Sequence, residues 1–381
     1  MKKFFITFTM IFGMCSFFAI GKTNLDFTGQ VSLFSNYSPQ YPMNFVNIGR
    51  YIPQLVFSDT LANSQLIDFE ASANITGNAS YHLFDNSAYQ GNISPYRLWG
   101  RYSGKQFEIR IGLQKIDFGS ATILRPMQWF NSISPRDPLK ITNGVWGALG
   151  RYYFLNNANV WAWLLYGNEN QRGLDLFDTY KKEPEYGFRW QQPLPKGELA
   201  LSYHHRTFKT MILPSDPIGT FSEKNPEDRI GLDGKWDLGV GLWFEAVYIM
   251  PAKESINYPD QALLNIGLDY TFGIGNGLYV LFEHLITNYT KIPSVFNANN
   301  NTTASLISYP LGLDDNISSI LAYGWDTKAL SVFMNYSHQF EKFMGYVMVT
   351  YNSQNTIKVL DIVFENPYKG PGIQLMLVYN H

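Results

Sequence analysis

Residues 106–114 read Gln-Phe-Glu-Ile-Arg-Ile-Gly-Leu-Gln. Successive side chains of a β-strand point to opposite faces, so this stretch has one apolar face and one polar face. The apolar face carries Phe107, Ile109, Ile111 and Leu113. Similar two-faced segments recur from residue 25 to the end of the chain. Such strands either pack their apolar faces together in a soluble β protein or turn them toward lipid.

The first residues favour export. Lys2 and Lys3 precede an apolar run, and the small residues Ala19 and Gly21 follow it. This order predicts a signal peptide over residues 1–21, cleaved after Gly21. A membrane anchor is the alternative, but the run is slightly short for a span and no positively charged stop follows it. Cys15 lies inside the run without the flanking residues of a lipoprotein signal, so lipidation is disfavoured.

Composition excludes several classes of protein. Cys15 is the only cysteine, so a mature chain has no disulfide, zinc or thiol chemistry available. Loss of Lys2 and Lys3 leaves 29 − 2 = 27 basic residues against 31 acidic ones, a formal charge of −4. The chain has no basic stripe for nucleic acid. We therefore predict no cofactor, no metal and no nucleic-acid partner.

The balance of aromatic and charged residues favours a membrane barrel. Aromatic residues make up 16% of the chain, and charged residues also make up 16%, below the usual quarter or so. Beyond the signal no run of 18 apolar residues occurs, which excludes spanning helices. An exported, aromatic-rich chain of this kind suits an outer-membrane β-barrel, whose strands need only short alternating segments and aromatic girdles.

The pattern predicts about eighteen strands, and sixteen are also compatible with it. They lie near 24–34, 43–57, 64–76, 95–103, 105–116, 144–154, 158–167, 184–192, 196–208, 227–237, 239–250, 261–272, 276–287, 317–325, 329–339, 343–352, 356–365 and 370–381. Short turns largely alternate with the long polar connections 77–93, 117–143, 168–183, 209–226 and 288–316. A barrel predicts this alternation and a soluble sandwich does not.

Three segments carry more particular predictions. The polar run 297–303 is typical of the tip of an exposed loop. Segment 160–166 is apolar on both faces, so its inward side should pack on something. Residues 372–381 alternate after a glycine and resemble the C-terminal strand that barrel-assembly machinery reads, although Asn380-His381 replaces the usual terminal aromatic. This last strand must pair with the first, because an open sheet edge is not tolerated in lipid.

No linker or composition change divides the chain. We therefore predict one domain over residues 22–381, an all-β fold that is a closed antiparallel transmembrane β-barrel of 16–18 strands.

The most unusual stretch follows the predicted strand at 106–114. Residues 119–142 are dense in proline, aromatic and charged residues, with prolines at 126, 135 and 138. Connections of this length are usually functional or mobile, and rigid prolines with apolar anchors favour an ordered one. We expect the segment to fold into the barrel lumen and narrow it.

Here the sequence resembles a family. Gly-x-Gln-x-Ile-x-Phe-Gly at 112–119, Arg125-Pro126, Trp129-Phe130-Asn131 and Pro135-x-Asp137-Pro138 resemble the porin and alginate-export-like outer-membrane barrels of Gram-negative bacteria. In that family the corresponding strand leads into a segment folded into the lumen. Leu113 stands where the family has arginine. The resemblance implies passive diffusion of small hydrophilic solutes through the outer membrane.

The residues themselves also indicate a constriction. Cations cluster in the first half of the chain with a few acids beside them, and a cation excess in a pore favours anions. For each charge the alternative is an ion pair that braces a strand or loop. Trp99 shares a strand face with two arginines and Trp129 lies on the long connection, so both are candidates for solute contact. The predicted pore-lining residues are Arg97, Trp99, Arg101, Glu108, Arg110, Asp117, Arg125, Trp129, Arg136, Asp137 and Lys140.

Two other functions remain open. A plugged barrel would serve as a surface-polysaccharide, assembly or adhesin component of the outer membrane. A barrel enzyme would need a nucleophile beside a histidine, and Ser202 with His204 is the nearest approach to one. No Gly-x-Ser-x-Gly or His-Glu-x-x-His motif supports it, so we predict that the protein is not an enzyme. The oligomeric state is left open.

Overall fold

The computed structural model describes residues 24–39, 45–61, 64–82, 87–175, 177–211, 222–252, 259–289, 300–353, 356–359, 362–365 and 370–381. The predicted signal peptide, residues 1–21, lies outside these ranges. Among the described residues no helix is long and apolar enough to cross a membrane.

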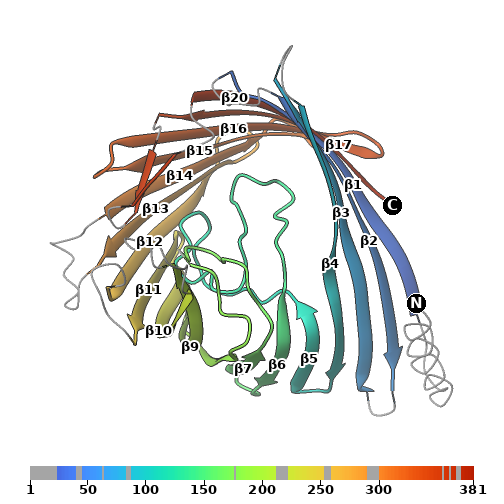
Figure 1. The fold of residues 1–381 in the computed structure, drawn as a ribbon, viewed down its shortest axis with the longest axis vertical. Coiled ribbons are helices and arrows are strands. Elements are labelled where there is room, and N and C mark those ends of the chain that lie inside the picture. Colours follow the sequence, from blue (N-terminus) through green and yellow to red (C-terminus); the bar gives the residue numbers. More distant parts are fainter. Residues whose placement is uncertain are drawn as a thin grey trace.

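Eighteen antiparallel strands form one sheet that closes on itself (Figure 1). The strands are β1 (Asn24–Tyr37), β2 (Phe45–Thr60), β3 (Leu66–Tyr81), β4 (Ser87–Ser103), β5 (Phe107–Gln114), β6 (Val145–Tyr153), β7 (Asn159–Leu165), β8 (Glu185–Leu194), β9 (Gly197–Met211), β10 (Ser222–Asp237), β11 (Gly241–Pro251), β12 (Gln261–Phe272), β13 (Leu278–Asn288), β14 (Asn300–Pro310), β15 (Asp315–Gly324), β16 (Ala329–Gln339), β17 (Phe343–Asn352) and β20 (Gly370–Asn380).

Each strand pairs with the next along the chain, and the last strand closes the ring. β20 pairs with β17 on one side and with β1 on the other, where Leu33 lies opposite Leu377. No strand edge is left open, as a membrane barrel requires. The predicted closed barrel and the predicted pairing of its first and last strands are both confirmed.

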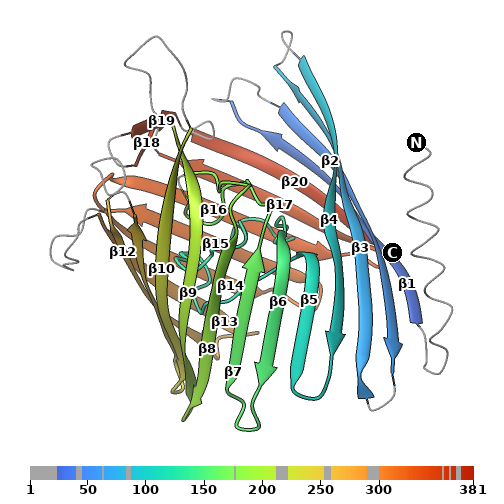
Figure 2. The ribbon, with the colours of Figure 1, turned by 60° about the horizontal axis from the view of Figure 1, so that its bottom comes forward.

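Short turns and long connections lie at opposite ends of the strands. At one end the strands are joined by turns such as 104–106 and 195–196, while the other end carries 115–144 and 166–184. Figure 2 shows the turn between β6 and β7 at the short-turn end. The predicted alternation of short and long connections is confirmed.

Strand β5 is two-faced in the structure, with one exception. Ile109 and Ile111 are exposed on the outer surface, and Glu108 points inward and is buried. Leu113, predicted to face outward into lipid, is only 5% exposed. Its neighbour Gly112 has a φ of 124°, and a Cβ there would lie 2.1 Å from the Leu98 carbonyl oxygen.

The strand count is right, but the prediction omits one wall strand and includes one that is not in the wall, so the two errors cancel. The sequence pattern assigns the residues of β14 to the polar connection 288–316, because Thr303 and Ser305 on its outer face hide the alternation. Residues 300–303 are therefore strand rather than loop tip. Conversely, 356–365 is no wall strand: β18 (Thr356–Val359) and β19 (Ile362–Glu365) pair only with each other.

Candidate functional site: the barrel lumen

The connection between β5 and β6, residues 115–144, lies inside the barrel (Figure 1), and we call it the inner segment. It leaves the wall through Gly119, whose φ is 99°. A Cβ at Gly119 would lie 2.4 Å from Glu245 Oε1, so only glycine permits this approach to the opposite wall. The inner segment therefore crosses the lumen from β5 toward β11.

Two carboxylates on the far wall hold the turn of the inner segment by its backbone. Glu245 of β11 accepts hydrogen bonds from the amides of Ala121 at 2.8 Å and Met127 at 3.1 Å. Glu283 of β13 accepts three more, from residues 122 (2.6 Å), 123 (3.1 Å) and 124 (2.6 Å). Both side chains are buried. Hydrogen bonds to a charged acceptor are stronger than neutral ones, so these two residues are the main polar anchors of the segment.

Sequence reasoning missed both anchors. The available signal was a single acid on the inward face of an otherwise apolar strand, as in Leu281, Glu283 and Leu285. An acid there needs a partner, because an unpaired buried charge is costly.

Apolar packing seals the same half of the lumen. Met127, Trp129 and Phe130 of the inner segment are buried against Trp163 and Leu165 of β7. The expectation that the inward side of 160–166 packs on something is thus confirmed. Trp129, predicted to contact solute, is 2% exposed and its indole nitrogen donates to the Pro126 carbonyl. As a correction, Trp129 belongs to this packed core, because its large apolar ring is shielded from water there.

The other predicted residues of the inner segment mostly shape it. Asp117 forms ion pairs with Arg125 at 2.5 Å and Lys115 at 3.3 Å. Asp137 accepts from the backbone amides of residues 139 and 141, both at 3.0 Å. Lys140 is exposed and has a φ of 49°. These contacts give the segment a fixed shape rather than a free set of charges.

Arg136 and Arg97 attach the inner segment to two further stretches of wall. Arg136 donates to the Ser331 hydroxyl on β16 and, at 3.5 Å, to Asn352 on β17. Burial lowers the pKa of Arg136 from its ordinary value. Arg97 of β4 donates to the Thr142 carbonyl at 3.0 Å and lies over the Tyr96 ring. The segment is therefore held on several sides of the lumen.

The remaining predicted residues form a charged cluster on β4 and β5. Arg101 pairs with Asp68 at 2.8 Å, and Glu108 is shared by Arg110 at 3.0 Å, Arg101 at 3.4 Å and Arg151 at 3.8 Å. The guanidinium groups of Arg110 and Arg101 lie 4.6 Å and 5.7 Å from the centre of the Trp99 ring. Three arginines thus share two carboxylates at ion-pair distance, and the carboxylate of Glu70 on β3 interacts with Arg110 as well.

A second charged cluster, on β8–β10 and the connection 166–184, is balanced and dry. Arg206 and Arg229 both bridge Asp175 and Glu227, and Arg172 pairs with Glu185. Three arginines meet three acids, and all six side chains are at most 6% exposed. The cluster fixes the connection 166–184 to the wall.

Three arginines form no ion pair among the described residues. In the part of the chain that the structure describes, Arg50, Arg97 and Arg136 have no carboxylate oxygen within 4.0 Å. Gly49 of β2 lies opposite Leu33, whose side chain is exposed on the outer face. The next residue along β2, Arg50, therefore points inward. No group of three metal-ligating side chains is present among the described residues.

Neither a family model nor a curated protein matches the chain. Solved structures do match in fold. OccAB1 of Acinetobacter baumannii has a TM-score of 0.58 at 10% identity, covering 94% of this chain and 96% of its own. OccK5 (OpdH) of Pseudomonas aeruginosa has a TM-score of 0.56 at 9% identity, covering 94% and 98%. These are likenesses of fold, since no family model and no curated sequence matches the chain.

A third similar structure is Wzi of Escherichia coli, described as a carbohydrate-binding β-barrel involved in capsule assembly. It has a TM-score of 0.53 at 12% identity and covers 93% of this chain and 84% of its own. At such identities the likeness defines the fold alone. This chain therefore has the fold of the outer-membrane porins of Gram-negative bacteria, an 18-stranded closed barrel.

Proposed function

We propose that the protein is a channel of the bacterial outer membrane through which small hydrophilic solutes diffuse, with a preference for anions. The observation that carries the proposal is the uneven lumen. The inner segment is packed with β6, β7, β11–β17 and β20, whereas the wall of β1–β5 carries polar side chains that include Arg50 and Arg97, neither of which has a carboxylate oxygen within 4.0 Å among the described residues. Barrels of this size can leave an aqueous path, and unpaired cations along it favour anions.

The proposal includes export and assembly. Residues 1–21 would be removed as a signal peptide, and residues 372–381 would be read by the barrel-assembly machinery. We propose no catalysis. Ser202 is buried and donates no proton to His204 in any described contact; it accepts from Arg189 at 3.0 Å.

Planar-bilayer recording tests the channel. Purified protein should give discrete conductance steps, and a salt gradient should give a reversal potential of anion selectivity. A protein that inserts but never conducts, with or without residues 120–141, would refute the channel. Cation selectivity would refute the preference for anions and leave the channel itself standing. Swelling of liposomes in a panel of sugars, amino acids and anions would then identify the solute.

A plugged barrel is the second candidate, favoured by one observation. The inner segment and the connection 166–184 bury a continuous apolar and ionic core inside the lumen. Such a barrel would act as a surface-polysaccharide, assembly or adhesin component of the outer membrane. Binding of polysaccharide by a barrel that does not conduct would favour this candidate over the channel.

A further inference from the structure

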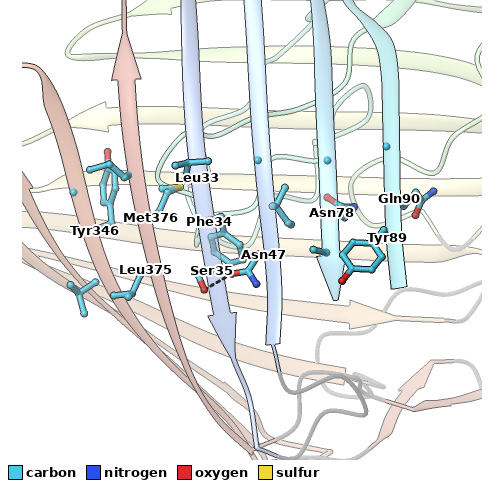
Figure 3. A pocket seen from close by; sticks show the side chains of 18 of the residues that line it. Leu33, Phe34, Ser35, Asn47, Asn78, Tyr89, Gln90, Tyr346, Leu375 and Met376 are labelled. Atoms are coloured by element: carbon cyan, nitrogen blue, oxygen red, sulfur yellow. Dashed lines mark hydrogen bonds between the residues drawn. The ribbon is translucent and has the colours of Figure 1, made fainter. Parts of the chain in front are cut away.

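A groove of about 1020 Å³ crosses the outer surface of β16, β17, β20 and β1–β4 (Figure 3). Its walls include Leu33, Leu375 and Leu377, which are about half exposed on the outer face. Figure 3 shows Leu33, Ser35 and Asn47 on neighbouring strands beside it. Since exposed leucines cover the outside of the barrel elsewhere too, the groove is continuous with the surface that faces lipid.

Three glycines in register form part of the groove floor. Gly49 lies opposite Gly77, and Gly77 lies opposite Gly91 on the next strand. None of the three has a positive φ. A Cβ at Gly77 would meet nothing within 4 Å, and at Gly49 and Gly91 the nearest atoms would lie at 3.8 and 3.9 Å. Neither backbone strain nor packing within the chain requires glycine here.

Glycine inside a strand weakens it and often marks a place where another molecule approaches closely. The row continues from Gly49 through Leu33 and Leu377 to Gly345 and His338. Such a row runs perpendicular to the strands, and barrel strands tilt by about 35–45°. The groove therefore climbs obliquely across the apolar belt, from the short-turn end on β16 to the long-connection end on β4.

The two ends of the groove carry aromatic groups. Tyr89 lies at the β4 end, and Tyr336 lies at the β16 end, where it donates to Asp315 at 2.5 Å. Tyrosines of this kind mark the membrane interfaces. Between them the polar groups Ser35 and Asn47 satisfy each other at 2.7 Å. An occupant of the middle of the groove must therefore be apolar and elongated.

We propose that this groove holds one lipid acyl chain in a fixed position, with its headgroup at an aromatic end. A second copy of the chain fits less well, because a two-fold interface would set one hollow against the same hollow. A flexible hydrocarbon tail follows a narrow oblique groove and is present wherever the barrel is inserted. The inference rests on the barrel and its outer face, and it is independent of conduction through the lumen.

Native mass spectrometry of the purified full-length protein tests the site, with 1-palmitoyl-2-oleoyl phosphatidylethanolamine as the added lipid. The wild type should retain one lipid. Gly77→Leu should weaken retention about tenfold, as expected for the loss of about two buried methylene groups. The matched control is Gly150→Leu, another outward glycine, where a Cβ would meet only the Ala162 carbonyl oxygen at 4.0 Å. It should bind as the wild type does.

A folded barrel gives a heat-modifiable shift on a denaturing gel. If Gly77→Leu does not give this shift, Gly91→Val is the second variant. Equal lipid retention by wild type, groove variants and control would overturn the proposal. The proposal would also be overturned if the wild type formed a dimer, or a complex with another protein, and Gly77→Leu dissociated it without changing lipid retention.

Discussion

Two parts of the barrel interior are built from the same alternating strands and differ in how they use their inward side chains. Along β6–β13, the inward face is covered by the inner segment and by residues 166–184, and buried arginines pair with acids there, as Arg189 does with Asp233 and Arg229 with Glu227. Along β1–β5, Arg101 and Arg110 share Asp68 and Glu108 with Arg151 of β6, and Arg50 and Arg97 have no carboxylate oxygen within 4.0 Å among the described residues. Matched, dry charges hold a plug in place, while unmatched charges remain able to act on a solute.

Deleting residues 120–141 should have the largest effect, because it removes what separates the two regions. We expect single-channel conductance to rise at least about twofold, since the segment fills lumen that water and ions would otherwise occupy. Planar-bilayer recording measures this. An unchanged conductance from a folded barrel would mean that the inner segment does not limit the path.

Arg229→Met should test the dry region most sharply. It leaves Asp175 and Glu227 with one fewer cation, and breaking a buried ion pair costs about 3–5 kcal/mol. Thermal unfolding in detergent should show the loss, with conductance little changed below the transition. Lys224→Met on the same strand removes an exposed pair with Glu183 and is the control, with no expected change in melting temperature. An equal loss of melting temperature in both variants would contradict the distinction between buried and exposed ion pairs.

Glu283→Ala should loosen the inner segment without unfolding the barrel. Three backbone amides lose their acceptor, at a cost of about 3 kcal/mol for hydrogen bonds to a charged group. Conductance should become noisy, with additional substates. Glu198→Ala, whose carboxylate contacts Gln191 on the neighbouring strand instead, should leave the recordings unchanged. Quiet, wild-type recordings from Glu283→Ala would show that this anchor is dispensable.

Arg50→Gln should change selectivity and little else. Removing an inward cation that has no acidic partner should shift the reversal potential toward zero, while the free energy of unfolding stays within about 0.5 kcal/mol. The exposed Lys105→Gln at a short turn is the control. A large loss of stability in Arg50→Gln would instead place this arginine with the structural charges.

Sequence patterns located the wall well and the contents of the lumen poorly. Ile109 and Ile111 faced outward as alternation predicts, because a strand's side-chain period is local. β14 was missed because Thr303 and Ser305 replace apolar residues on its outer face. Glu245 and Glu283 escaped notice because their partners are backbone amides more than a hundred residues away, which leave no mark on nearby side chains.

The sequence by itself determined the closed barrel, its alternating short and long connections and the segment most unlike a strand. These depend on periodicity and turn chemistry, which act between neighbours in the chain. Only the tertiary structure decided that Trp129 is core, that Arg136 reaches β16 and β17, and which charges are matched. Those outcomes depend on how eighteen strands and two internal segments fill one enclosed space, because burial and distance across that space set the energy of each charge.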